Sequence, residues 1–224
     1  MVRNFIRMAA LSIVLAAAPA WANQITTIAF SDAIPVATTS WNDFADLGKF
    51  DTNLGTLLSI DVFLDGKVEG STRFESLDPS PTTVTVNLSS TVTLKKPDSS
   101  TLSTAFPVFT KIEPVSPFDG GIDFGGGSGR TFLGLSAINS DHVTLTGPFS
   151  ALDLAAFTAP GGGALSLPVM SVGTSNGSGS GNLLLQFTTM AGADVRIVYT
   201  YKAVPEPATL ALLAAGALGL RRRR

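Results

Sequence analysis

The sequence predicts an all-β fold: an antiparallel β-sandwich or jelly-roll-like single domain, flanked by an N-terminal signal peptide and a C-terminal transmembrane helix. Three observations predict it. Apolar and polar residues alternate over much of the chain, strand-like segments recur about every ten residues between Gly, Pro, Asn and Ser, and both chain ends are apolar runs beside arginines. Alternation with β-branched residues indicates half-buried strands. Their regular spacing is typical of sandwiches and jelly rolls.

Three segments carry the clearest strand pattern: Leu58–Leu64, Thr83–Leu88 and Asp194–Lys202. We expect the following side chains to point inward: Leu58, Ile60, Val62 and Leu64; Val84, Val86, Leu88, Val92 and Leu94; Val195, Ile197, Tyr199 and Tyr201. Further predicted strands are Gln24–Phe30, Lys67–Ser76, Phe106–Ile112, Thr131–Leu135, His142–Phe149, Leu165–Val172 and Leu183–Met190.

Between the strands, the sequence predicts a hairpin turn, two short helices and a loop. Asp65-Gly66 lies between two strand patterns and has the composition of a hairpin turn. Trp41–Leu47 and Ser150–Phe157 are the two helical candidates, with Ser40 and Ser150 as N-caps. Gly173–Gly181 reads as an exposed glycine–serine loop.

The N-terminus has the pattern of a secretory signal peptide covering residues 1–22. Arg3 and Arg7 form a basic region, and Met8–Ala18 form an apolar region that is too short for a membrane span. Ala20 and Ala22 fit a small-residue cleavage site, which gives a mature start at Asn23. Ala18 and Ala20 form a competing site, which the proline between them disfavours.

The C-terminal segment, residues 204–224, combines an extended motif, an apolar run and a basic end. Pro205 and Pro207 oppose helix formation, the run 208–220 is apolar, and residues 221–224 are four arginines. Thirteen helical residues span about 20 Å, which is short of the roughly 30 Å of a bilayer core. Arginines after such a helix keep it oriented with its basic end in the cytoplasm. The segment is therefore either a temporary membrane signal or a plain anchor that is never cut.

The order of these parts resembles the PEP-CTERM sorting tail of bacteria that produce exopolysaccharide. The matching residues are Pro205, Glu206, Pro207, Arg221, Arg222, Arg223 and Arg224, on either side of the apolar run. The resemblance implies an exported protein that passes through the secretion machinery and is held briefly in the inner membrane. It further implies cutting near Pro205–Pro207 by exosortase, followed by release to the cell surface or extracellular matrix.

Residues 23–203 form the predicted folded domain, and three of its segments resemble a bacterial surface-domain family called choice-of-anchor E. They are Phe50–Leu57 (FDTNLGTL), Phe118–Gly129 (FDGGIDFGGGSG) and Asp153–Phe157 (DLAAF) followed by Gly161. Ala159-Pro160 departs from the family pattern, which has a glycine there. The resemblance implies a surface domain joined to a sorting tail, and it assigns no activity.

Composition limits the function of this domain. Of the 15 Lys and Arg, two lie in the predicted signal peptide and four in the tail; of the 17 Asp and Glu, only Glu206 lies in the tail. That leaves 9 basic and 16 acidic residues, a net charge of about −7, which disfavours nucleic-acid binding. The chain has no cysteine, so thiol catalysis and cysteine metal sites are excluded.

The glycine-rich segment Asp119–Arg130 is the strongest candidate for a ligand site in the domain. Asp119 and Asp123 lie four residues apart among glycines, and they offer carboxylates to a hard cation such as calcium. The alternative is a tight loop whose aspartates cap turns, with Asp123 pairing with Arg130. The glycines do not follow the spacing of a phosphate-binding loop.

Catalytic patterns are weak. His142 is the single histidine, Asp141 beside it belongs to the opposite strand face, and Ser128 lacks the spacing of a nucleophile elbow. We expect His142 to begin a strand at the surface. Paired carboxylates for glycoside hydrolysis would come from Asp61, Asp65, Glu69 or Glu75. Aromatic platforms for sugars would come from Trp41, Tyr199 or Tyr201, of which the two tyrosines fit the core better.

The sequence thus predicts a non-catalytic, cofactor-free envelope or matrix protein with a structural or adhesive role associated with exopolysaccharide. A carbohydrate- or calcium-binding module of the cell surface is the alternative. A glycan-active enzyme is a third reading, which rests on the acidic residues alone.

Overall fold

The structure is a computed structural model that describes residues 24–179 and 181–204. The predicted signal peptide, with Ala20 and Ala22, lies outside the described residues. So do the apolar run 208–220 and the sorting residues Pro205, Glu206, Pro207 and 221–224. Within the described ranges, no helix has the length and hydropathy needed to cross a bilayer.

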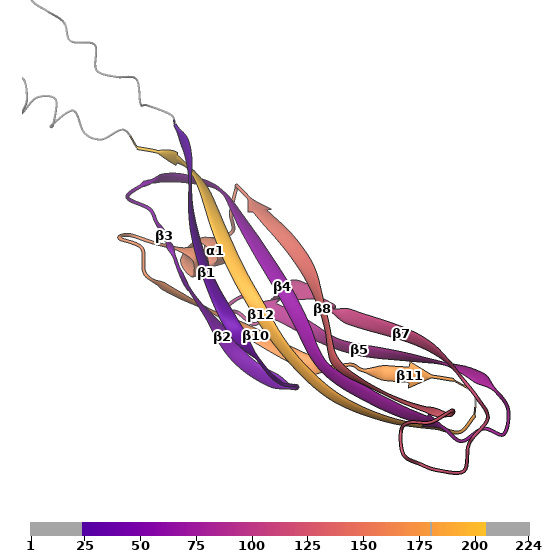
Figure 1. Cartoon of the computed structure of the whole chain (residues 1–224). Coiled ribbons are helices and arrows are strands. Elements are labelled where there is room, and N and C mark those ends of the chain that lie inside the picture. The colour runs from indigo at the N-terminus through magenta and orange to yellow at the C-terminus, as the bar shows by residue number, and fades with distance from the viewer. Residues whose placement is uncertain (1–23, 180, 205–224) are drawn as a thin grey trace, which may run out of the picture.

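Two sheets, antiparallel throughout, make up most of the described chain (Figure 1). The first has the order β1 (Ile25–Thr38), β12 (Leu183–Ala203), β4 (Gly55–Ser76) and β8 (Gly129–Thr146). The second has the order β11 (Asn176–Ser178), β5 (Thr82–Lys95), β10 (Ala164–Gly173) and β2 (Trp41–Gly48), and β6 (Thr101–Ala105) and β7 (Val108–Val115) also pair with β5. A parallel pair, β3 (Phe50–Asp51) and β9 (Thr158–Ala159), and one helix, α1 (Ala151–Phe157), complete the described fold.

The core lies between the two sheets, as in a β-sandwich. Its larger cluster combines side chains of β4 and β12 with side chains of β5, β10 and β2, including Ile60, Val62, Leu64, Val92, Leu94, Leu167, Val195, Ile197 and Tyr199. The buried Tyr199 hydroxyl donates to the Gly48 carbonyl at 3.0 Å, and burial raises the pKa of Tyr199. A smaller cluster of Phe74, Val84, Val86 and Val115 fills the far part of the sandwich. The all-β, antiparallel prediction is confirmed.

Alternation predicted the inward faces well, with one exception at the start of β4. Leu58 is 38% exposed, whereas Ile60, Val62 and Leu64 are buried. The β4–β12 register shifts between Thr200 and Tyr201, so Leu58 has no opposite residue and turns outward. The prediction of an inward Leu58 is therefore wrong.

The strands are longer than the sequence predicted. Leu183–Met190 and Asp194–Lys202 are one strand, β12, because Ala191, Gly192 and Ala193 between them keep pairing with β4. In the same way, the predicted strand 131–135 and most of the predicted strand 142–149 join in β8, which ends at Thr146. The small residues 191–193, which the sequence pattern suggested as a break between strands, are hydrogen-bonded into the sheet without interruption.

The predicted hairpin turn at Asp65-Gly66 is wrong, because both residues lie inside β4. Gly66 faces the second sheet, where an added Cβ would lie 2.9 Å from the Cβ of Ala105 and 3.3 Å from that of Val92. The glycine is needed for close approach of the sheets, and Asp65 faces outward beside it.

Of the two predicted helices, one is confirmed. Ser150 caps α1, since its side chain accepts the Asp153 N–H at 3.0 Å. Trp41–Leu47 is instead strand β2, paired along its length with β10. With Ala45 and Leu47 buried and Phe44 57% exposed, its alternation has period two, so the helix prediction and the Ser40 cap are wrong. The predicted loop 173–181 contains the short strand β11.

Aspartate and asparagine side chains join the two sheets at the open edges of the sandwich. On one edge, the Asp32 carboxylate in β1 accepts the Asp46 N–H of β2 at 2.8 Å. On the other, Asp141 in β8 accepts the Ser103 hydroxyl at 2.7 Å and the Thr104 N–H at 3.1 Å, and Asn139 accepts the Phe106 N–H at 2.9 Å. These bonds satisfy N–H groups that an edge strand would otherwise expose for aggregation.

Asp141 makes the stability of the domain depend on pH in the acid range. The hydrogen bond from the Ser103 hydroxyl, with a second from the Thr104 N–H, lowers its pKa from the ordinary 3.8. A lowered folded pKa contributes stability above the ordinary value, and this is lost as the pH falls through the folded pKa. We therefore expect Asp141→Asn to lower the unfolding free energy at pH 7 by about 1 kcal/mol.

The difference between wild type and Asp141→Asn should shrink as urea unfolding is repeated below pH 4. Ser140→Ala, on the outward face one residue before, is the matched control and should unfold like the wild type throughout. A constant difference between pH 7 and pH 2 would show that the charge of Asp141 contributes nothing.

Candidate functional site

The sandwich has two opposite ends, and both chain ends emerge at one of them, which we call the sorting end (Figure 1). Ile25 of β1 pairs with Lys202 of β12, and Gly55 of β4 pairs with Ala203. β4 has 22 residues, which corresponds to a strand of roughly 70 Å. At its other end, Ser76 of β4 pairs with Leu183, and Glu75 pairs with Gly129 of β8. We call this opposite end the loop end.

At the sorting end, β12 ends at Ala203, and backbone hydrogen bonds to the domain continue to Val204, the residue before the predicted motif. The Ala203 N–H donates to the Gln24 carbonyl and the Val204 N–H to the Leu54 carbonyl, both at 3.0 Å. Pro205 follows Val204 directly. Three residues, Pro205 to Pro207, separate this last hydrogen bond from the predicted apolar helix, and they reach at most about 10 Å. The motif thus has no flexible linker between it and the folded domain.

Three apolar side chains are exposed around this exit. Ile25 is 65% exposed, Val204 60% and Leu54 38%. The backbone of Ala203 and Val204, which leads into the predicted motif, is held against the domain by the hydrogen bonds to Gln24 and Leu54. The sequence predicted the motif but not its distance from the last strand, which depends on where pairing ends.

The loop end carries the glycine-rich segment, which is organised by a buried carboxylate. Glu75, at the end of β4, has no exposed surface. It accepts the Ser128 hydroxyl at 2.6 Å and the Phe124 N–H at 2.8 Å. Gly129 passes so close that a Cβ there would overlap the Glu75 carboxylate. Sequence reasoning considered Glu75 as a catalytic carboxylate and missed this anchoring role, because nothing in the pattern places residue 75 beside residue 128.

The two predicted calcium ligands lie in this loop and bond to backbone N–H groups. Asp119 accepts the N–H groups of Gly121 at 3.2 Å and Gly127 at 3.1 Å, which lower its pKa. Asp123 accepts the Gly125 N–H at 2.8 Å. Over residues 24–179 and 181–204, no three His, Cys, Asp or Glu are grouped so as to hold a metal ion. Calcium at Asp119 and Asp123 stays a prediction.

Arg130 does not pair with Asp123, as the alternative reading of the loop proposed. Its guanidinium donates to Glu113 at 3.1 Å and to the carbonyls of Gly126 and Gly129 at 2.7 and 2.6 Å. The turn-capping part of that reading agrees with the structure, and the arginine closes the loop against β7.

His142 lies in the middle of β8 rather than at a strand start, on the outer face of the four-stranded sheet. Its ring stacks on Phe63 with 4.3 Å between centroids, and its Nε2 is 3.3 Å from the Asp61 carboxylate. Asp141 points the other way, toward β6, as the alternation predicted. The guanidinium of Arg196 covers the Phe63 ring at 4.1 Å. Sequence reasoning missed this row of Arg196, Phe63 and His142, which strand register brings together.

The remaining predicted site residues are scattered. Asp61 accepts the Thr144 hydroxyl at 2.6 Å, and Asp65 and Glu69 follow it along β4. Asp61 and Asp65 are four strand residues apart, about 13 Å, which exceeds the separation of glycosidase carboxylates. Trp41 donates to the Ala191 carbonyl, and Tyr199 and Tyr201 are buried, so the core assignment of the tyrosines is confirmed.

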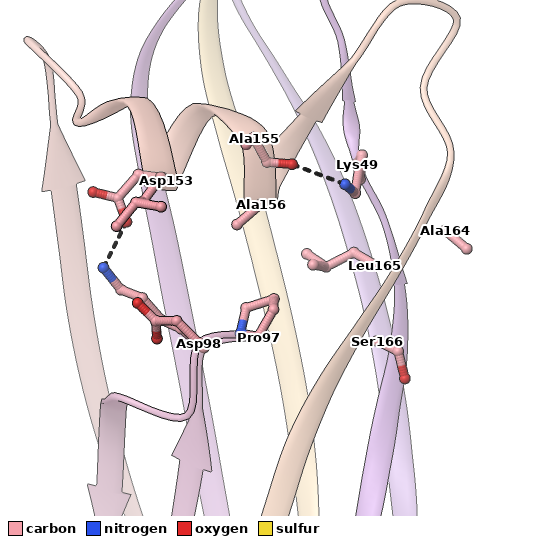
Figure 2. Close-up of a pocket in the computed structure, with 11 residues that line it drawn as sticks. Lys49, Pro97, Asp98, Asp153, Ala155, Ala156, Ala164, Leu165 and Ser166 are labelled. Atoms are coloured by element: carbon pink, nitrogen blue, oxygen red, sulfur yellow. Dashed lines mark hydrogen bonds and ion pairs between the residues drawn. The ribbon is translucent and has the colours of Figure 1, made fainter.

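A pocket of about 510 Å³ opens where α1 crosses the second sheet (Figure 2). Its charged groups bond to one another or to the backbone. Lys96 pairs with Asp153 at 2.6 Å, and Lys49 donates to the Ala155 carbonyl at 3.0 Å. The bond from Lys96, with a second from Ser150, lowers the pKa of Asp153. The apolar part of the lining includes Pro97, Ala156 and Leu165. We therefore interpret the pocket as a gap in the packing of α1 against the sheet.

Comparisons with solved structures give little about the domain. The chain is 12% identical to a chain in the structure of the infectious bursal disease virus Gt strain, and the match covers 97% of this chain and 55% of that one at a TM-score of 0.14. It is also 12% identical to a chain of the VP2 subviral particle of that virus. That match covers 89% of this chain and 46% of the other, at a TM-score of 0.16. The chain thus spans about half the length of these viral chains, and scores this low establish no shared fold. No curated protein matches the chain.

The family comparison concerns the C-terminal segment. Residues 203–224 match the family model of the PEP-CTERM protein-sorting motif. This match begins at the last residue of β12 and includes the whole predicted tail. The motif indicates an exported protein that is held transiently in the membrane and processed by exosortase. The chain therefore carries a PEP-CTERM sorting signal at the sorting end of a β-sandwich.

Proposed function

We propose that this chain is a bacterial cell-envelope or extracellular-matrix protein whose folded domain has a non-catalytic, structural or adhesive role associated with exopolysaccharide. The observation that carries the proposal is the position of the sorting motif: the match begins at Ala203, the last residue of β12, and Pro205 directly follows Val204, which is still hydrogen-bonded to the domain. The motif supports export and processing by exosortase, and the attached domain is the cargo.

The geometry supports a defined orientation before the tail is cut. A helix at 208–220 in the inner membrane would hold the sorting end within about 10 Å of the bilayer. The glycine-rich loop at the loop end then lies roughly 70 Å from it. After the cut near Pro205–Pro207, the same elongated domain is released or joined to surface material.

A structural role is supported by the way the domain uses its acidic side chains. Asp32 and Asp141 join the sheets, Glu75 and Asp119 hold the glycine-rich loop, and Asp153 pairs with Lys96. Each of these carboxylates receives hydrogen bonds from neighbouring groups of the chain. They stabilise a rigid elongated shape, which suits a matrix component.

The experiment is co-sedimentation of the exported protein with exopolysaccharide purified from the same host. We expect the protein to pellet with the polysaccharide and to generate no new reducing ends during prolonged incubation. Protein that stays in the supernatant would reject matrix association. New reducing ends, abolished by substituting one carboxylate, would instead establish a glycan-active enzyme.

A further inference from the structure

The outer face of the four-stranded sheet has a hollow, and we propose that it binds a neutral saccharide through Arg196 and Asp65. This inference rests on the proposed function, because it names the site and the ligand class through which the domain would contact the matrix. The α1 pocket is a poorer candidate, since its charged groups are already paired.

The hollow lies over β1, β12 and β4 and has a volume of about 490 Å³, within the range of small-molecule sites. It is lined by Ser31, Asp32, Ala33, Phe63, Asp65, Asp194, Val195 and Arg196. Strand register places Ser31 of β1 opposite Arg196, and Arg196 opposite Phe63. The outward residues of β1 here are small, which leaves room beside the larger side chains of β12 and β4.

Arg196 is held in place without using its hydrogen-bond donors. Its guanidinium carbon lies 4.1 Å from the centre of the Phe63 ring. The Phe63 ring in turn stacks on the ring of His142, which helps to fix its position. Among the described residues, Arg196 has no hydrogen-bond or ion-pair partner. A guanidinium stacked on an aromatic ring keeps its N–H groups free at its edge, arranged as a rigid fork.

Asp65 supplies the complementary acceptor. Within residues 24–179 and 181–204, its carboxylate has no bonding partner. The other two carboxylates of the hollow are engaged: Asp194 pairs with Lys67, and Asp32 accepts the Ala33 and Asp46 N–H groups. A free donor fork and a free carboxylate lie on neighbouring strands of one hollow. Sugar hydroxyls, which both donate and accept, match that combination.

The charge of the hollow favours a neutral ligand. The lining residues carry three carboxylates and one guanidinium, and even with Lys67 paired to Asp194 the local charge is net negative. The predicted mature domain also has a net charge of about −7. A uronic-acid or phosphate-bearing chain would be repelled by this field, whereas a neutral hexose chain is not. The hollow begins eight strand residues from Gly55, roughly 27 Å from the sorting end, so a polysaccharide can reach it beside a membrane.

The test measures binding of neutral gluco- and galacto-oligosaccharides by the exported protein, with an oligouronate of equal length as the anionic comparison. We expect saturable binding of a neutral oligosaccharide, weakened about tenfold by Arg196→Gln and by Asp65→Asn. Arg196→Lys should weaken binding similarly, since lysine keeps the charge but loses the fork. Lys202→Gln, on the same strand and outside the hollow, should bind like the wild type.

The outcomes separate this inference from the proposed function. If the wild type and all variants pellet equally with the host polysaccharide, matrix association stands and the hollow is not the site. If the wild type binds neither polysaccharide nor oligosaccharide, both proposals fail. Preference for the oligouronate would overturn the inference that the ligand is neutral. Melting temperatures equal to that of the wild type exclude misfolding as the cause of a loss.

Discussion

Gly70→Ala is expected to lower the free energy of unfolding by about 3 kcal/mol or more. Gly70 lies inside β4 at φ +153°, a backbone conformation that L side chains rarely adopt. A Cβ at this position would overlap the backbone carbonyl oxygen of Thr188 in β12. The β4–β8 register shifts between Gly70 and Thr72, whereas pairing of β4 with β12 continues through Gly70, so the irregularity lies on the β8 side alone.

Gly134→Ala is the matched control, because Gly134 also has a positive φ, +66°, but has open space around the position of a Cβ. We expect it to cost about 1 kcal/mol, the backbone contribution alone. Urea unfolding at neutral pH measures both variants. Equal losses would mean that the approach of Gly70 to Thr188 adds nothing. An unchanged midpoint for Gly70→Ala would contradict the described path of β4.

Glu206→Ala is expected to leave the protein uncut and in the membrane fraction. Glu206 is the charged residue of the sorting motif, within the segment that matches the family model. Because β12 ends at Ala203 and Val204 is still hydrogen-bonded to the domain, the enzyme can contact few residues before the cut. A single lost contact should then reduce processing at least tenfold, the effect of one charged hydrogen bond. Immunoblotting of membrane and medium fractions measures the ratio of the two forms.

Lys202→Ala is the control for this variant. Lys202 belongs to the same end of the domain but precedes the matched segment. Its substitution should leave processing unchanged. Normal release of Glu206→Ala would reject the motif as the recognition element, and equal retention of both variants would indicate that the folded end matters more than the motif.

The sequence predicted the fold class because burial imposes alternation locally. Val84, Val86, Ile197 and Tyr199 are buried as expected, since each sits on a strand with one face in the core. The ends of the strands were predicted less well than their faces. Ala191-Gly192-Ala193 reads as a break, yet the partner strand extends through it. The helix expected at 41–47 failed because pairing with β10 outweighs a weak local preference.

The candidate sites also differ in how far the sequence could predict them. The sorting tail is a continuous motif, so sequence alone located it. The hollow requires Arg196 to meet Phe63 and Asp65, which lie more than 130 residues earlier in the chain. Register alone brings them together, and a shift of one residue would turn these side chains into the core. Glu75 and Ser128 meet at the loop end for the same reason.

The most direct test of the central claim is the intact mass of the protein from its native host, with and without the exosortase gene. We expect a released or surface-attached species that runs from Asn23 to about Pro205–Pro207 and that is lost when exosortase is absent. A full-length tail retained in the membrane of both strains would contradict it, and would make the chain an ordinary anchored surface protein.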